Sequence, residues 1–281
     1  MKTVRSFLAI SFAATAALAI AQDAHVVRIK INPGTKLSTS SSGTTKMVFA
    51  GVMDDTMDST TSIAQTFSFE PADGGKTKFT VATTDFKMEG GMMDQMGGDT
   101  NSVKKATLTG MFDDRGATTD VALNGVQEGD MMATMVMMQP KEMFKQVGFF
   151  GVVFPEEAVS VGSKWNGTLN FAEILSSQSM GFLQNAKGEI PIENEVVAFE
   201  SVDGMGCVKI KSFMDGKVTF DVAAPGMESS GNMTLTGVTH AWYSLADGLL
   251  VKSESSSASV IDMGVMTINQ SSEMKTSAKR S

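Results

Sequence analysis

The sequence predicts a mainly β protein of the α+β class. We expect long antiparallel strands that curl into a half-barrel, or into two related sheets, covered by a central helix. Most of the 281-residue chain alternates apolar and polar residues with a period of two, and Gly and Asp pairs interrupt this alternation. One stretch near the middle has a helical period instead. A sheet that is apolar on one face needs a partner, and this helix is available to cover it.

The first 21 residues have the features of a secretory signal peptide. Lys2 and Arg5 precede a short apolar run, and the small residues Ala19 and Ala21 stand before a cleavage point at Gln22. A retained membrane anchor is the weaker alternative, because the run is shorter than the roughly 20 residues that span a bilayer. We therefore expect an exported protein, periplasmic or extracellular after cleavage near Ala21.

Charge and cysteine content narrow the function classes. Cleavage removes two positive charges, which moves the formal net charge from −8 to −10. Such acidity argues against a nucleic-acid partner, because phosphates would repel the protein. No later segment approaches the length of a transmembrane span, so we expect a protein that does not span the membrane. Cys207 is the only cysteine and cannot form an internal disulfide, so packing must hold the fold.

The β-strands divide into two halves, at residues 22–127 and 149–281, which we expect to form one continuous domain. A similar order of motifs in both halves suggests a weak internal duplication. A second, shorter helix is expected around residues 173–183. Clear strand patterns cover residues 25–31, 76–88, 165–171, 207–213 and 249–260, and hairpin turns are predicted at residues 71–76, 202–206, 214–217 and 245–249.

The helix that connects the halves lies within residues 128–148. Asp130 can cap its first turn by accepting free backbone N–H groups. Met131, Met135 and Met138 follow at i, i+4 and i+7, which places three thioethers on one helical face. Pro140 should restart or kink the helix, because proline lacks the backbone N–H and crowds the preceding turn.

The C-terminal half resembles a family of exported bacterial proteins of unassigned function (DUF6263-like). The resemblance covers about residues 140–281. The stretches that support it are "FPEEAVSVGSKW" from Phe154, "VDGMGCVKIKSF" from Val202 and "AWYSLADGLLVKSES" from Ala241. They are turn and strand-start motifs, so they indicate fold rather than chemistry. In overall shape the family is similar to periplasmic lipoprotein-carrier folds, which are incomplete β-barrels covered by a helix.

The sequence offers little for catalysis. Its only histidines are His25 and His240, and it has neither a G-x-S-x-G nucleophile elbow nor a glycine-rich phosphate loop. Acyl transfer needs a nucleophile, a base and an orienting group together. We interpret Cys207 as a small buried residue, and His240 as a structural partner of Trp242. We expect a protein that is not an enzyme and has no cofactor.

Metal binding has two weak candidates. Asp54, Asp55 and Asp58 lie close in sequence but lack the glycine and the distal glutamate of a calcium loop, so a solvated turn is favoured. A Cu(I) site is a further alternative, because thioethers are soft ligands and a Gly-rich segment holds three methionines, Met92, Met93 and Met96.

The chain has 23 methionines, and they are spread through strands as well as the helix. They can simply fill a core. They can also line a tolerant groove for a lipid or other apolar ligand, because unbranched thioethers adapt to varied shapes. A third alternative is a structural or interaction protein of the envelope that binds another protein and no ligand. The groove hypothesis assigns its lining to Met131, Met135, Met138, Phe144, Phe149 and Phe150.

Overall fold

The computed structural model describes residues 24–32, 34–51, 54–91, 100–126, 131–177, 183–224 and 227–281. The predicted signal peptide and the Met92–Met96 segment lie outside them. The strands are β1 (Lys36–Gly51), β2 (Asp55–Pro71), β3 (Thr77–Gly90), β4 (Thr107–Phe112), β5 (Thr118–Asn124), β6 (Lys164–Leu169), β7 (Leu183–Lys187), β8 (Ile190–Val202), β9 (Met205–Ala224), β10 (Met227–Ser244), β11 (Leu250–Asp262) and β12 (Met266–Arg280). The helices are α2 (Thr100–Lys105), α3 (Met131–Val147) and α4 (Phe171–Ser177), with short 3-10 turns η1 (Asp73–Gly75) and η2 (Phe149–Gly151).

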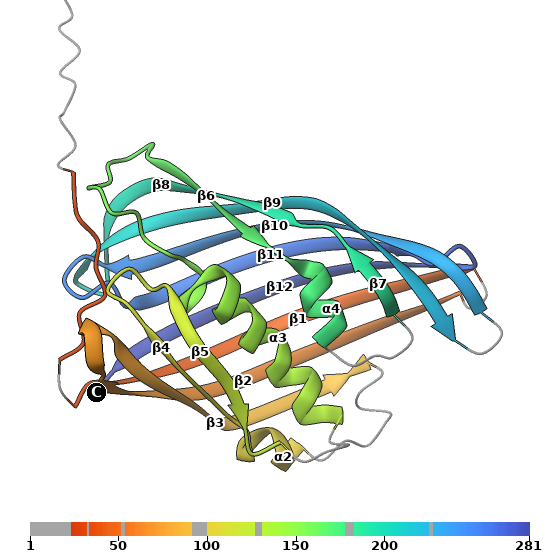
Figure 1. Cartoon of the computed structure of the whole chain (residues 1–281), viewed down its shortest axis with the longest axis horizontal. Coiled ribbons are helices and arrows are strands. Elements are labelled where there is room, and N and C mark those ends of the chain that lie inside the picture. Colours follow the sequence, from red (N-terminus) through yellow and green to blue (C-terminus); the bar gives the residue numbers. More distant parts are fainter. Residues whose placement is uncertain are drawn as a thin grey trace, which may run out of the picture.

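All the described strands belong to one antiparallel sheet. Its order is β5-β4-β3-β2-β1-β12-β11-β10-β9-β8-β6, and β7 pairs with β9 beside this path. The two halves of the chain meet in the middle, where β1 pairs with β12 from Leu37↔Arg280 to Gly51↔Met266. The sheet curls around α3, which contacts both edge strands, β5 and β6 (Figure 1). The predicted mainly β half-barrel with a central covering helix is confirmed, as one open sheet rather than two.

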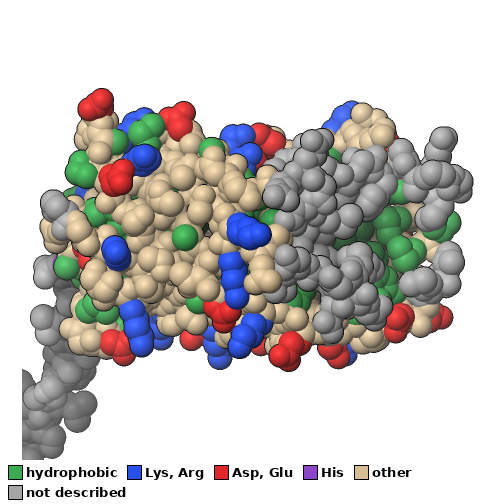
Figure 2. Space-filling view, turned by 90° about the horizontal axis from the view of Figure 1, so that it is seen from below, with side chains coloured by type: hydrophobic (Ala, Val, Ile, Leu, Met, Phe, Trp, Pro, Cys, Tyr) green, Lys and Arg blue, Asp and Glu red, His purple; other side chains and the backbone are tan. Residues whose placement is uncertain are grey.

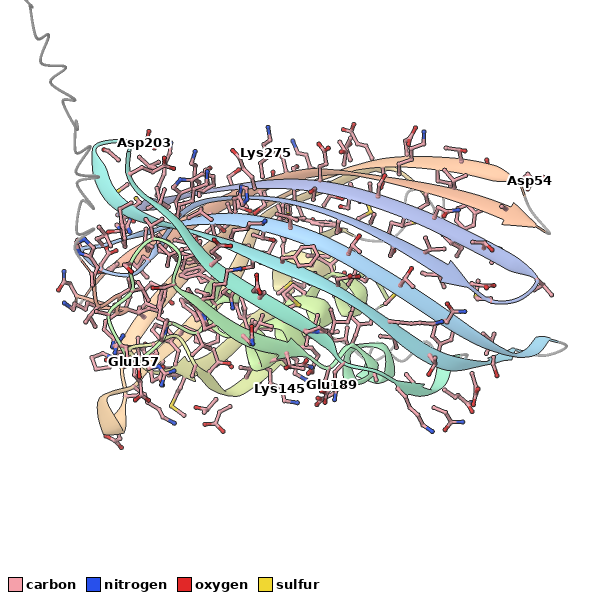
Figure 3. The ribbon with its side chains drawn as sticks, turned by 90° about the horizontal axis from the view of Figure 1, so that it is seen from above. Asp54, Lys145, Glu157, Glu189, Asp203 and Lys275 are labelled. Atoms are coloured by element: carbon pink, nitrogen blue, oxygen red, sulfur yellow. The ribbon has the colours of Figure 1, made fainter. Side chains whose placement is uncertain are left out.

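The sheet has two unlike ends. The near end contains the C-terminus and the β8–β9 turn at Asp203, and the far end contains the β1–β2 connection next to Asp54 (Figure 3). The main core cluster lies at the near end and includes Leu37, Phe79 and Val208, which have no exposed surface. A second cluster, around Ile190 and Val218, lies under α4 and the far parts of β9 and β10.

The segment that begins at His25 is not the strand that we expect from its alternation. It forms one isolated bridge at His25 and otherwise runs across loops at the near end. The N–H of Ile29 donates to the carbonyl of Asp114 (2.6 Å), and the N–H of Lys30 donates to the carbonyl of Asp247 (2.9 Å). Its donors are therefore used by two separate loops, which leaves no continuous neighbour for a ladder.

The hairpin turn predicted at residues 214–217 is wrong, because β9 continues through it. Gly216 is extended there and serves a packing role. A Cβ atom at this position would lie 3.0 Å from Cγ1 of Ile190 on the neighbouring β8. Glycine therefore allows the isoleucine side chain to cross the strand, and no positive φ is needed.

The second helix starts and ends earlier than predicted. Asn170 caps α4, because its side-chain oxygen accepts the N–H of Glu173 at 3.1 Å. The helix ends at Ser177, residues 178–182 lie outside the described ranges, and Leu183 already belongs to β7. In α3, the restart or kink expected at Pro140 does not divide the helix.

Candidate functional site

The face of α3 that meets the core differs from the predicted thioether face. Ala133, Met137 and Val147 are buried, and Phe144 is half-buried beside them. Met137 is 1% exposed, and the buried hydroxyl of Thr83 on β3 contacts its sulfur at 3.8 Å. Successive residues of this face are four, seven and three positions apart, which is a helical period like that of the predicted thioether face. The buried face begins two residues after the predicted one.

The predicted thioether face of α3 is only partly visible. The side chains of Met131, Met135 and Met138 lie outside the described residues, so their groove-lining role stays a prediction. Glu142, one helical turn beyond Met138, is buried between Lys141 and Lys145, with N–O distances of 3.5 Å and 3.6 Å. That part of the face is therefore covered.

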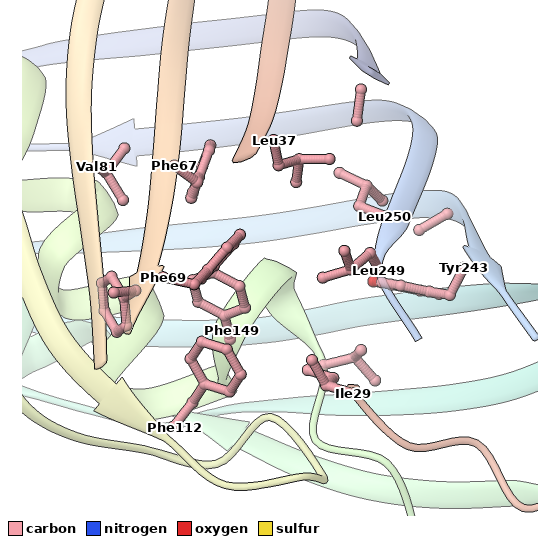
Figure 4. Close-up of a cluster of buried hydrophobic side chains, with 14 of the residues drawn as sticks. Ile29, Leu37, Phe67, Phe69, Val81, Phe112, Phe149, Tyr243, Leu249 and Leu250 are labelled. Carbon is pink, nitrogen blue, oxygen red and sulfur yellow. The ribbon is translucent and has the colours of Figure 1, made fainter. Parts of the chain in front are cut away.

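The three predicted phenylalanines belong to an aromatic cluster at the near end. Phe149 has no exposed surface and stacks on Phe112, with ring centroids 4.3 Å apart and planes 14° apart. The rings of Phe144 and Phe150 lie 5.6 Å and 4.2 Å from that of Phe149. The close-up shows Phe149 between strand side chains of β2 and β4 (Figure 4). Neighbouring rings cover Phe149 completely, so its side chain packs in the core, and the groove-lining role of the three phenylalanines stays a prediction.

A buried hydrogen bond fixes the turn that places Phe149. The hydroxyl of Tyr243 on β10 donates to the carbonyl oxygen of Phe150 at 2.9 Å. Phe150 has a positive φ of 59°, a conformation that a bulky residue adopts only under tertiary constraint. Complete burial raises the pKa of Tyr243 above its ordinary value, so the hydroxyl remains a donor.

Charge is segregated between the two faces of the long strands. Successive side chains of a strand point to opposite faces, and the register aligns Leu37 of β1 with the buried Phe67 of β2, which defines the inner, concave face. Between the strand ends, the described inner-face positions of β1–β3 and β9–β12 have no charged side chain. Charged residues such as Lys46, Glu254 and Lys275 lie on the outer face.

The middle of the inner face is lined by hydroxyl groups. We call this set the hydroxyl belt. Its side chains are half-buried, whereas the intervening outer-face serines of β11 and β12 are exposed. The register places the belt residues side by side across six strands: Ser212, Thr239, Ser253, Ser255, Ser257, Ser272, Thr276, Ser41, Thr45, Ser59 and Thr61.

One apolar side chain projects from the centre of this belt. Met274 of β12 pairs with Gly43 on one side and with Ser255 on the other, and 41% of its surface is exposed. A methionine on the inner face of a central strand would be buried if α3 packed directly on it. The exposure of Met274 therefore marks open, accessible space on the concave face.

Apolar residues follow the belt at the far end of the inner face. They are half-buried and belong to five adjacent strands. We call them the far-end patch: Met47, Met57, Leu235, Ile261, Met266 and Ile268. Hydrophobic side chains are visible at this end of the molecule in the space-filling view (Figure 2). The concave face thus changes from hydroxyl-lined to apolar along its length. Four residues of the patch also pack on one side against the second core cluster: Leu235, Ile261, Met266 and Ile268.

The outer face contains His240 and Trp242, which we expect to be structural partners. Trp242 is 4% exposed because the ammonium groups of Lys209 and Lys252 lie over its ring, 4.6 Å and 4.1 Å from its centroid. Its indole N–H donates to Glu200. His240 lies beside it, and desolvation together with the nearby lysines lowers the pKa of its imidazole.

Cys207 is fully buried on the same face. Burial raises the pKa of its thiol, which disfavours the reactive thiolate. His25, in contrast, lies against Phe199 near the start of the described chain. The structure therefore does not bring the two histidines and the cysteine together.

No cluster of metal-binding side chains occurs in the ranges that the structure describes, counting groups of three or more His, Cys, Asp or Glu. Asp54 and Asp55 accept backbone N–H bonds where β2 begins. Asp58 lines a surface depression of about 530 Å³ together with Lys46, Glu89 and Glu273. These charged residues belong to the outer face, and the lining of the depression also includes the belt residues Thr45, Ser59, Ser257 and Ser272. The copper candidates Met92, Met93 and Met96 lie outside the described residues, and that alternative stays a prediction.

None of the described helices is both long and apolar enough to cross a bilayer. No family model matches the sequence, and neither does any curated protein. Among solved structures, a lipovitellin determined for its lipid–protein interactions is similar at 9% identity and a TM-score of 0.46, over 90% of this chain and 26% of that one. The present chain thus spans about a quarter of the lipovitellin chain.

Two further structures cover 85% of this chain and 99% of their own. They are an engineered protein of asymmetric conductivity, at 9% identity and a TM-score of 0.27, and a mutant porin of Rh. blastica, at 8% and 0.26. Likenesses at this level establish neither the fold nor a function for the present chain.

Proposed function

We propose that this protein is an exported, non-enzymatic binding protein that holds a lipid or other apolar ligand on the concave face of its sheet, next to α3. The main support is the exposure of Met274 in the middle of an uncharged inner face. The contiguous far-end patch on the same face adds to this support, because contiguous apolar surface commonly marks a binding site. We place the ligand on the belt and the far-end patch and not against Phe149, because that ring has no exposed surface.

Uptake of lipid by the purified protein tests this proposal. The mature chain is incubated with a mixture of a fatty acid, a phospholipid and a monoacylglycerol, and bound species are detected by native mass spectrometry. We expect one lipid per chain. A variant that fills the concave face, Ser257→Phe, should abolish uptake, whereas Ser256→Phe on the outer face of the same strand should not. An unliganded mass after exposure to all three lipids would exclude the proposal.

A structural role in the envelope is the second candidate, and the completely packed aromatic cluster around Phe149 favours it. Such a protein would bind a partner through the outer face or the edge strands β5 and β6. Cross-linking in the native envelope would recover that partner. Recovery of a stoichiometric partner together with failure to take up lipid would favour this candidate over the first.

Export and family membership are parts of the same proposal. The N-terminal Lys2, Arg5 and small-x-small pattern supports cleavage near Ala21. The turn motifs of the C-terminal half support membership of the DUF6263-like family. The N-terminal sequence of the protein purified from its native envelope tests export: a chain that begins at Met1 would contradict it.

A further inference from the structure

The hydroxyl belt restricts the chemistry of the ligand. A purely apolar ligand would cover the belt without using it, and would cost the hydroxyl groups their water contacts. Ser255 and Ser257 have no side-chain hydrogen bond within the part of the chain that the structure describes, and both are half-buried. Each hydroxyl can donate one hydrogen bond and accept others. Serines two residues apart on one face are separated by about 6.6 Å, so both can contact one polar head group.

The absence of charged side chains on this strand face disfavours ionic head groups. On β1–β3 and β9–β12, the described inner-face positions between the strand ends have no cationic side chain. A carboxylate or phosphate on the belt would therefore not be paired by any of them. Moving an ionised group from water to such a site is costly unless it is paired. The lysines of β11 and β12 do not help, because Lys252 and Lys275 lie on the outer face.

The apolar end of the same face provides a place for a hydrocarbon chain. Ile261 lies four residues beyond Ser257 on β11, about 13 Å along the strand. Ile268 pairs with Ile261, and Met47 and Met57 pair with each other on the neighbouring strands. A ligand with a polar head on the belt would therefore extend its chain over the far-end patch.

Building on the proposed function, we propose that the ligand is a single-chain lipid with an uncharged, hydroxyl-bearing head group, of the monoacylglycerol type. Its head group forms hydrogen bonds with Ser255 and Ser257, and its acyl chain lies along the far-end patch. An ionised fatty acid binds more weakly because its carboxylate finds no cation.

Three probes of equal chain length test this inference: monopalmitoylglycerol, palmitate and methyl palmitate. The first has hydroxyls and no charge, the second is charged, and the third has neither feature. Affinity is measured for each by fluorescence displacement. Because only monopalmitoylglycerol has free hydroxyl groups for hydrogen bonds with the belt serines, it should bind roughly tenfold more tightly than methyl palmitate, and palmitate should bind more weakly than monopalmitoylglycerol.

Variants identify the belt as the source of this preference. In the double variant Ser255→Ala and Ser257→Ala, the advantage of monopalmitoylglycerol over methyl palmitate should fall to about twofold or less. The matched control is Ser256→Ala, which removes an exposed hydroxyl from the outer face of the same strand. It should leave the preference for monopalmitoylglycerol over methyl palmitate unchanged. Ser257→Lys should strengthen palmitate binding, whereas Ser256→Lys should not.

The outcomes separate the two proposals. If none of the three probes binds, the proposed function fails, and this inference fails with it. If all three bind with equal affinity, or if palmitate binds most tightly, the binding function stands and the inference is overturned. It is also overturned if the double variant keeps the full preference.

Discussion

The packing of Phe149 leads to a prediction that separates a core from a groove. Replacement by alanine removes a ring with no exposed surface that stacks on Phe112 at 4.3 Å. Truncation of a buried phenylalanine costs about 3–5 kcal/mol, which includes the lost transfer free energy and the cavity left behind. The aromatic contacts of this ring place the expected loss near the middle of that range, at about 4 kcal/mol. A domain is stable by only about 5–15 kcal/mol, so the variant should fold but with a large loss of stability.

The assay is equilibrium unfolding in urea, followed by tryptophan fluorescence. The free energies of unfolding of the wild type, Phe149→Ala and Phe213→Ala are compared. Phe213 is the control, because 41% of its surface is exposed on the outer face, and its truncation should cost about 1 kcal/mol or less. The slope of free energy against urea should be similar in all three proteins, because the surface exposed on unfolding is similar.

An equal effect of the two substitutions would refute the reasoning. It would mean that Phe149 borders space that is empty, or filled only when a ligand is bound, as the groove hypothesis expects. In that case added lipid should stabilise the wild type more than Phe149→Ala. A large loss for Phe149→Ala that lipid does not alter would place this ring in the core.

Three further predictions concern single residues. Tyr243 is the only tyrosine in the sequence, and burial raises its pKa in the folded state above the ordinary 10.0. Its contribution to the free energy of unfolding is therefore complete below pH 10 and is lost as the pH rises further. In an alkaline titration, tyrosinate absorbance should appear only together with unfolding. Gly110→Ala should lower the free energy of unfolding in urea by about 1–3 kcal/mol, because its Cβ would lie 2.7 Å from the ring of Phe79. Gly167→Ala should lower it less, since the nearest neighbour of its Cβ would be 3.9 Å away. Equal losses for the two variants would contradict this packing. Cys207 should react with a thiol reagent far more slowly in the native protein than in urea, since it is buried and its pKa is raised, and rapid native labelling would show that the site opens.

The alternation of the sequence was sufficient to predict the sheet, because a strand buried on one face must repeat every two residues. It failed at residues 214–217, where Met-Asp-Gly-Lys has the composition of a turn. Gly216 is there for close packing against Ile190, and a single sequence does not distinguish that need from a need for positive φ. Nor does the segment from His25 reveal that loops, rather than a strand, will accept its hydrogen bonds.

The candidate site was harder to predict for two physical reasons. Methionine occupies five of the positions from 131 to 138, so almost any helical face of α3 contains thioethers, and the period cannot identify the one that meets the sheet. The belt strand β11 reads "SESSSAS", with serine on both faces, and therefore has no apolar alternation. Only the register, which aligns Ser255 with Met274 and Ile261 with Ile268, assigns its inner face.

The same polar strands explain how the molecule can present an open concave face. A sheet whose central strands had large apolar residues on the inner side would draw α3 onto them and close the space. In β11 the inner positions from Ser253 to Ser259 are all serine. In the neighbouring β1 and β12, the pairs Ser41–Thr276 (2.9 Å) and Thr45–Ser272 (3.2 Å) hydrogen-bond across the two strands. These contacts, with the backbone ladder, maintain the hairpins without a core beneath them. The stabilising apolar contacts lie instead in the main cluster around Phe149 at the near end and in the second cluster under α4, so the fold does not depend on filling the middle of the concave face.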